Sequence, residues 1–224
     1  MLAAASRALR RRTLRPVPFM AALGVFCLSN AAILLLSNRL RALAPDVGSI
    51  PDLRQDLTAP DVEAALSAYG AAGRRLFALI EAIDLCVFMW SYAFVLSGML
   101  SLGASAARLE VLKLVNLLPF AAAGADAAET GLMLAALWSY PRGAARLAPA
   151  IAAATRLKWR LLAATASAVG GVGCYCVATG LRRAGEPAAA ARGGGGGGEA
   201  APGGGGAAGG GRKQQQRQQR RRQR

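Results

Sequence analysis

Seven charged side chains interrupt the long apolar stretches of this sequence, and they are the residues best placed to do chemistry. They are Glu81, Asp84, Asp126, Glu129, Arg156, Lys158 and Arg160. A charge at the bilayer centre costs about 2.5–3.5 kcal/mol on insertion scales, so such groups must pair inside a helix bundle or face a wet cavity. Their layer could bind a lipid head group or an ion, or move protons. It could equally be a structural ion-pair network that fixes helix register.

The spacing of these residues places them at one depth. Counted from the predicted helix ends, all seven lie roughly 10–18 Å below the same membrane face, at about 1.5 Å per residue. Glu81 and Asp84 are spaced i, i+3, as are Asp126 and Glu129, so each pair shares one helix face. Lys158 points about 200° away from Arg156 around the helix. Either Lys158 or the pair Arg156 and Arg160 can therefore face the bundle, and the remainder would extend toward the interface.

We predict that Lys158 pairs with Asp126 or Glu129 in the bundle interior. Glu81 or Asp84 should lie close by. Neighbouring polar and aromatic side chains complete the predicted layer: Thr130 and Trp159, with Tyr92, Asn116, Arg156 and Arg160 as secondary members.

Four apolar stretches must position this layer, and each is long enough to cross a hydrocarbon core of about 30 Å. Thr58 can cap a helix and Pro60 suits its first turn, which predicts a short amphipathic helix lying on the membrane surface. The predicted fold is all-α, a membrane-embedded four-helix bundle within residues 17–182. Its spans cover residues 17–37, 74–102, 111–138 and 149–180, and the amphipathic helix covers residues 59–70.

The two ends of the chain differ from this core. Residues 1–16 are rich in Ala and Arg, and the first acid is Asp46. They predict either an organelle transit peptide, and hence a plastid or mitochondrial membrane, or a positive flank that orients the first span. Residues 183–224 contain low-complexity glycine runs and a Gln/Arg segment, which predict a disordered tail with a cationic end. That end could touch anionic lipid or RNA, or serve no dedicated role, and no specific nucleic-acid partner is expected.

Composition excludes several classes of function. The chain has no histidine, which argues against most His-dependent hydrolases, zinc sites and haem sites. The four cysteines lie in apolar stretches and are expected to pack as small apolar residues. The acids could in principle hold Mg²⁺ or Ca²⁺, but the nearby cations oppose this. No metal and no cofactor are therefore predicted.

A set of short motifs covers roughly residues 50–180 of the sequence. They are Gly73-Arg74, Asp84 with Tyr92, Pro119 with Asp126-Ala-Ala-Glu129-Thr130, Tyr140-Pro141, and Thr155-Arg-Leu-Lys158-Trp159. This set resembles a family of small four-helix membrane proteins of bacteria, algae and plants, with D-x-x-E-N and T-x-x-K-W motifs. The chain departs from it at Thr130, where the family has Asn, and it lacks a Pro before Tyr92. The resemblance implies a fold and a set of polar positions, but no activity.

Three functions fit this sequence. The leading one is a membrane protein that binds a lipid, a small metabolite or a partner helix, or that assembles as a homo-oligomer. The second is a membrane enzyme acting on a lipid by acid/base chemistry. Its acids, with Thr130, Lys158 and Trp159, faintly resemble the four-helix sterol-isomerase-like proteins, some of which also use histidine. The third is a subunit of a proton- or ion-coupled transporter, although the chain shows no inverted repeat.

Overall fold

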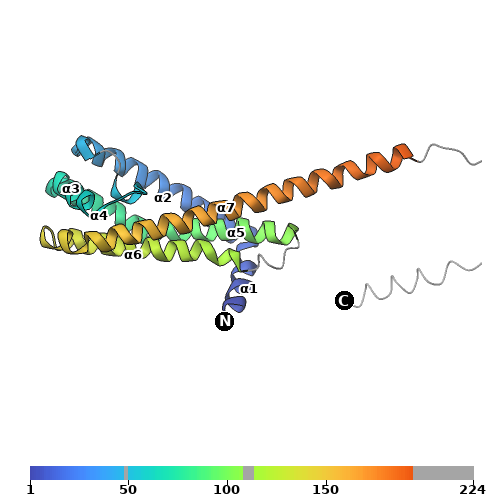
Figure 1. Ribbon diagram of the computed structural model, residues 1–224, viewed down its shortest axis with the longest axis horizontal. Coiled ribbons are helices and arrows are strands. Elements are labelled where there is room, and N and C mark those ends of the chain that lie inside the picture. The colour runs from blue at the N-terminus through green and yellow to red at the C-terminus, as the bar shows by residue number, and fades with distance from the viewer. Residues whose placement is uncertain (48–49, 108–113, 194–224) are drawn as a thin grey trace, which may run out of the picture. The chain divides into compact units, whose positions relative to one another are not determined.

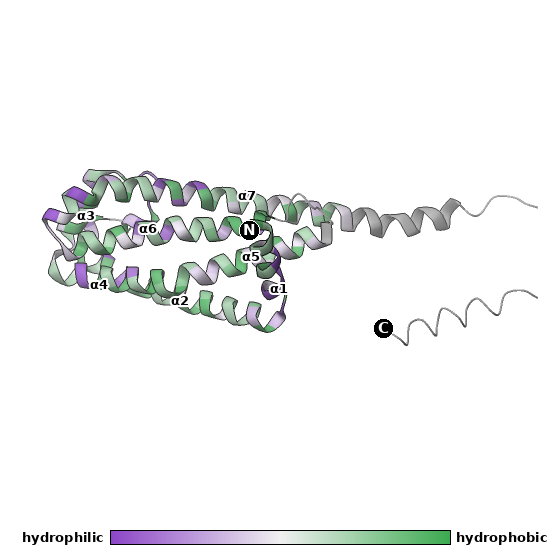
Figure 2. Cartoon of the chain, turned by 90° about the horizontal axis from the view of Figure 1, so that it is seen from below, coloured by the Kyte–Doolittle hydropathy of each residue, from purple (hydrophilic) through white to green (hydrophobic). Residues whose placement is uncertain are grey.

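The computed structural model describes residues 1–47, 50–107 and 114–193 of the chain. This described part is all-α, as predicted: it contains seven α-helices with short 3₁₀ and π turns, and no strand. Four helical stretches are long and apolar enough to cross a membrane, and they give the chain the architecture of a multi-pass membrane protein. Figure 1 shows these long helices alongside one another, and Figure 2 shows how apolar they are. The stretches are Pro16–Leu43, Gly70–Ser105, Val115–Trp138 and Arg142–Gly180.

The first span is α2 (Pro16–Leu43), which begins with a proline in its first turn, where the missing N–H costs nothing. The prediction placed its end at residue 37, because polar residues follow. In the structure the helix continues for six more residues and ends shortly before Pro45. Leu40 lies in this extension and is buried, so the added turns pack on protein.

The second span joins α4 (Gly70–Ile83), a π-helical turn η3 (Asp84–Phe88) and α5 (Met89–Ala107). It begins at Gly70, whose φ of 61° lies in the left-handed region that favours glycine. The π turn starts at Asp84 and was not predicted. The Trp90 indole N–H donates to the Leu85 carbonyl in this turn at 2.9 Å. Such turns occur often at functional sites, so this position supports a role for Asp84 beyond packing.

The last two spans are α6 (Leu118–Trp138), which follows the 3₁₀ turn η5 (Val115–Leu117), and α7 (Arg142–Gly193). A cis Tyr140-Pro141 bond joins them. Helix α7 begins seven residues before the predicted residue 149. It also continues to Gly193, whereas the predicted disordered tail begins at 183; four alanines before Arg192 favour this extension. The glycine runs and Gln/Arg segment of residues 194–224 lie outside the described residues.

The connection between the first two spans folds onto the bundle. It contains the turns η1 (Pro45–Val47) and η2 (Pro51–Leu53) and the helix α3 (Ala59–Ala68). A capping box between Thr58 and Asp61 starts α3, as the Thr58 signal predicted. Val62 and Leu66, on the apolar face of this helix, are buried against protein. They join the main apolar cluster with Leu40, Phe77 and Ile151.

The N-terminal segment is also folded. Helix α1 (Leu2–Thr13) packs against α5 and the start of α2, and it crosses the long helices in Figure 1. Ser6 and Thr13 are buried in this contact. The segment predicted as a flank or transit peptide is therefore a docked helix in this structure.

Candidate functional site

Lys158 lies at the centre of a buried cluster of acids. Its side chain is 3% exposed, and its ammonium contacts three carboxylates: Asp126 at 3.3 Å, Glu129, and Asp52 of η2. The Asp52 carbonyl also accepts a bond from Nζ at 3.1 Å. The predicted pairing of Lys158 with Asp126 or Glu129 is thus confirmed for both acids. Asp52 was not predicted, because it lies in a connecting loop rather than in a span.

Hydroxyl groups from neighbouring helices orient the acids. Asp84 accepts from Thr130 at 3.1 Å, Asp126 from Tyr92 at 2.9 Å, and Glu129 from Thr155 at 2.5 Å. All three bonds join side chains of different helical segments, so they fix the helices in register as well as the carboxylates in place.

The acids outnumber the cation in this cluster. Glu81 and Asp84 are 2% and 5% exposed, and neither forms an ion pair with another described residue. Glu81 interacts electrostatically with Asp52, Asp84, Lys158 and Glu129, which places it in the same cluster. A buried, unpaired carboxylate is costly. The excess negative charge must therefore be balanced by protons or by a cationic ligand.

A divalent metal ion is a poor occupant of this cluster. Oxygens of Asp52, Asp126 and Glu129 lie within 4.8 Å of one another, a spacing that could hold an ion. The Lys158 ammonium contacts all three, however, and so occupies the position that the ion would take. A metal would have to displace it.

The cluster borders a cavity of about 260 Å³. Asp52, Asp84, Asp126 and Lys158 form its polar end. Its apolar walls come from different helices: Phe26 of α2, Phe88 of η3, and Leu96 and Leu162 of α5 and α7. Phe26 stacks on Phe88 with ring centroids 5.4 Å apart. The cavity therefore has one charged end and one hydrocarbon-like side.

Trp159 also lines this cavity. Its ring lies 5.8 Å from Lys158 Nζ, and its buried indole N–H has no hydrogen-bond partner among the described residues. A buried donor without a partner is unfavourable unless something else satisfies it. This donor gives the cavity a second polar feature beside the acids.

The structure brings most of the predicted site residues together but excludes three. Arg156 and Arg160 lie on the exposed face of α7, so Lys158 faces the bundle instead. Asn116 is buried near α1, where it accepts a bond from the Ser6 hydroxyl at 2.7 Å. It also donates to the Ser101 hydroxyl at 3.3 Å. Asn116 therefore holds the N-terminal helix, not the acid cluster.

The prediction missed Asp52, and it named Thr155 only within the T-x-x-K-W motif without assigning it to the polar layer. Thr155 lies three residues before Lys158 and shares its helix face, so the T-x-x-K-W spacing could have identified it. Asp52 lies between apolar residues in a loop and offers no comparable periodic signal.

Comparison with known protein families, curated proteins and solved structures finds no match to this chain. The family resemblance described above therefore stays a prediction, and the site must be interpreted from its own geometry.

Proposed function

We propose that this chain is a membrane-embedded binding protein for an amphiphilic molecule. The polar end of the ligand would lie against Asp84, Asp126 and Lys158, and its apolar part along Phe26, Phe88 and Leu162. The observation that carries this proposal is that the charged cluster borders a cavity with an apolar wall. A network needed only to fix helix register has no use for such a space, since close packing would stabilise it better.

The charge of the cluster favours a ligand with an amine at its polar end. Asp84 borders the cavity and its only hydrogen bond among the described residues comes from Thr130. A protonated amine there would offset the excess of acids, and such charge-assisted bonds are roughly twice as strong as neutral ones. The cavity is slightly smaller than the roughly 300–1,000 Å³ of drug-sized sites. It therefore suits the head of an amphiphile and the first part of its chain.

The proposal is tested with three probes of equal chain length: dodecylamine, dodecanol and dodecanoic acid, each titrated onto the full chain in detergent. The expected order is amine first, the alcohol about tenfold weaker, and no binding of the acid. Asp84→Asn should weaken amine binding at least tenfold, because a charge-assisted bond contributes about 1.5–3 kcal/mol. The matched control is Glu63→Gln, which changes an exposed acid that does not line the cavity.

Calorimetry gives the affinities, and thermal unfolding shows whether each variant is folded. Equal affinity of the amine and the alcohol, or unchanged amine binding in folded Asp84→Asn, would contradict a carboxylate-lined amine site. Failure of all three probes to bind the folded protein would contradict the amphiphile site itself.

A second candidate function is acid/base chemistry on a lipid. It is favoured by one observation: Asp84 and Asp126, from two helices, border the same cavity as the Tyr92 ring. Two carboxyl groups that line one cavity can act as proton donor and acceptor. Conversion of a co-purified or added lipid, lost in Asp126→Asn, would distinguish an enzyme from a binding protein.

The membrane in which the protein lies is a separate proposal. The Ala- and Arg-rich composition of residues 1–16 supports a plastid or mitochondrial membrane. A fluorescent protein fused to the C-terminus would report the compartment. Retention of the label at the plasma membrane or endoplasmic reticulum would contradict it.

A further inference from the structure

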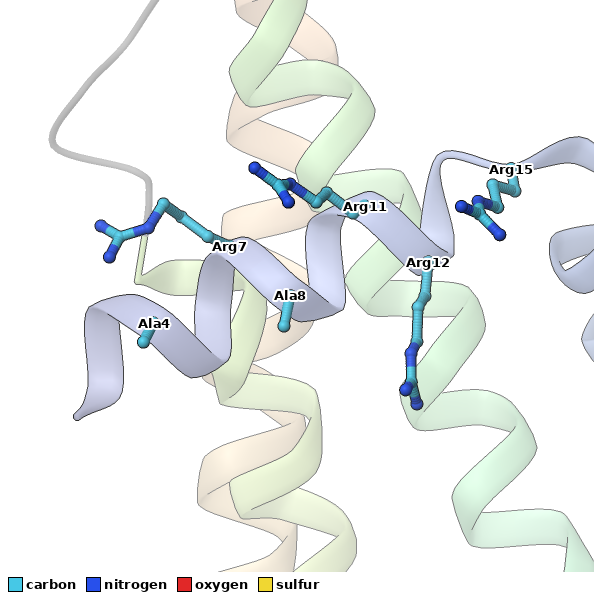
Figure 3. Close-up of a pocket in the computed structure, with 6 residues that line it drawn as sticks. All are labelled: Ala4, Arg7, Ala8, Arg11, Arg12 and Arg15. Carbon is cyan, nitrogen blue, oxygen red and sulfur yellow. The ribbon is translucent and has the colours of Figure 1, made fainter.

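The outer face of α1 and the residues just after it carry four arginines and no acid. Its inner face is made by Ser6, Leu9, Arg10 and Thr13, spaced i, i+3, i+4 and i+7, which are buried or partly buried against the bundle. The opposite face is exposed and lines a groove of about 500 Å³, shown in Figure 3. The residues of this groove, here called the arginine face, are Ala4, Arg7, Ala8, Arg11, Arg12 and Arg15.

Specific contacts hold α1 at the ends of two spans. Ser6 bonds to Asn116 just before α6 begins, and Arg10 donates to the Ser105 hydroxyl in the last turn of α5 at 2.7 Å. Figure 3 shows α1 running across the helices behind it. A helix in this position, perpendicular to spans at their ends, lies at the level of the membrane interface.

The close approach of α2 to α5 depends on Gly98. A Cβ atom at this position would lie 2.7 Å from the Phe19 ring and 3.5 Å from Thr13. Real Cβ contacts are essentially never shorter than 3.0 Å, so this corner of the fold requires a residue without a side chain. Gly98 therefore fixes the close contact of α2 with α5, and Thr13 of α1 packs beside it at an ordinary van der Waals distance.

The arginine face has no counter-charge within the described chain. None of the ion pairs among the described residues involves an arginine of α1. The first acid in the sequence, Asp46, follows the 28-residue helix α2, which is about 42 Å long. That distance is about five Debye lengths at physiological ionic strength. Glu110, in the connection before α6, lies outside the described residues and is accompanied there by Arg108 and Lys113.

We propose that the arginine face binds the phosphate groups of anionic phospholipids in the leaflet where α1 lies. Arginine matches phosphate oxygens with paired N–H donors, and it retains its charge at any physiological pH. The small side chains of Ala4 and Ala8 leave room for head groups to approach the helix backbone between the arginines. This inference is independent of the amine site, which Asp84, Asp126 and Lys158 line.

The test compares the full chain with a variant that carries Arg7→Gln, Arg11→Gln, Arg12→Gln and Arg15→Gln. Both are placed in nanodiscs of phosphatidylcholine with increasing phosphatidylglycerol, then extracted gently. Native mass spectrometry counts the anionic lipids retained per protein. The matched control replaces Arg39, Arg41, Arg142 and Arg146 by Gln, which removes the same charge from the other side of the bundle.

We expect the natural chain and the control to retain phosphatidylglycerol at least tenfold over phosphatidylcholine. The variant should lose most of this preference, since each surface arginine contributes about a fivefold preference at low salt. The preference should also fall as salt rises. An equal melting temperature of variant and natural chain in pure phosphatidylcholine shows that the fold is intact. If the quadruple variant unfolds, the pair Arg7→Gln and Arg11→Gln replaces it.

Several results would overturn the proposal. One is an undiminished lipid preference in the folded variant, and another is an equal loss in the control, which would indicate net charge alone. A third is a rise in melting temperature with inorganic phosphate that equals the rise with phosphatidylglycerol. That result would indicate a site for soluble anions. Complete removal of α1 from the protein isolated from cells would also overturn it.

Discussion

Positively charged side chains are buried and ion-paired in one part of the four-helix region and exposed without an acid partner in another. Toward the end where the connection between the first two spans packs on the bundle, Lys158 is buried and three carboxylates of the same chain contact its ammonium. At the other end, Arg7, Arg11, Arg12 and Arg15 are exposed and have no acid partner among the described residues. The difference indicates what each charge can do. A cation that is neutralised internally contributes to stability and shapes a site, whereas one without an internal partner is available to an external anion.

The largest expected effect is at the internally paired end. Lys158→Met leaves at least two buried carboxylates without a cation, and removing one partner of a buried pair typically costs about 3–5 kcal/mol. The double variant Lys158→Met, Glu129→Gln should lose less than the sum of the two single variants. Thermal or denaturant unfolding in detergent, arranged as a double-mutant cycle, measures this coupling.

The corresponding control is Arg156→Met, made two residues earlier on the exposed face of α7. It should change stability by no more than about 0.5 kcal/mol, as surface substitutions usually do. Additive losses at Lys158 and Glu129, or an equal loss at Arg156, would remove the contrast between paired and exposed cations.

A smaller effect separates the two roles of threonine on α7. Thr155 and Thr165 are both buried and both donate to the carbonyl four residues earlier. Only Thr155 also donates to a carboxylate, Glu129, at 2.5 Å. Thr155→Val should therefore cost about 1–3 kcal/mol, the penalty for leaving a buried charged acceptor without its donor. Thr165→Val should cost less than about 1 kcal/mol.

Unfolding experiments on the two valine variants check this expectation. Equal losses would mean that the bond to Glu129 adds nothing, and the acid cluster would then depend on Lys158 alone. If Thr155→Val costs no stability in a protein that already carries Glu129→Gln, the whole effect of Thr155→Val belongs to this bond.

Much of the acid cluster could be predicted from the sequence. The i, i+3 spacing of the acids and the angle between Lys158 and Arg156 are properties of any α-helix, so they constrain which side chains can meet. These angles show that Lys158 and the two arginines cannot all face the bundle. Which of them does so is determined by the packing of α7, and the sequence does not reveal that packing. Four helices long and apolar enough to cross a membrane are also present, because length and hydropathy are local properties, but their ends differ from the predicted ones.

Other parts could not be predicted for physical reasons. Asp52 reaches Lys158 because the burial of Ile50 and Leu57 draws its loop onto the bundle, and such tertiary contacts leave no periodic pattern. The π turn at Asp84 has no known sequence signature. Asn116 was assigned to the polar layer by its presence in a span, whereas its partner Ser6 is 110 residues away.

The smallest expected effect concerns an acid outside the membrane-spanning helices. Asp61 accepts bonds from the Thr58 hydroxyl and backbone N–H, and it forms an ion pair with Arg54 at 3.2 Å. The bonds from Thr58, and then the charge of Arg54, hold the pKa of Asp61 below its ordinary value of 3.8. Because the folded pKa is the lower one, ionised Asp61 stabilises the fold above pH 4. That contribution disappears as the pH falls through the folded value.

Melting temperatures of the natural chain and Asp61→Asn, measured from pH 7 to pH 3, test this expectation. The difference between the two proteins cancels the titration of the buried acids, which both contain. Asp61→Asn should melt slightly lower at pH 7, and the difference should shrink below pH 4. High salt should reduce it at pH 7, because the Asp61 side chain is partly exposed to solvent. A difference independent of pH and salt would mean that the neutral cap geometry, not the charge, stabilises α3, and that exposed acids here contribute no electrostatic stability at all.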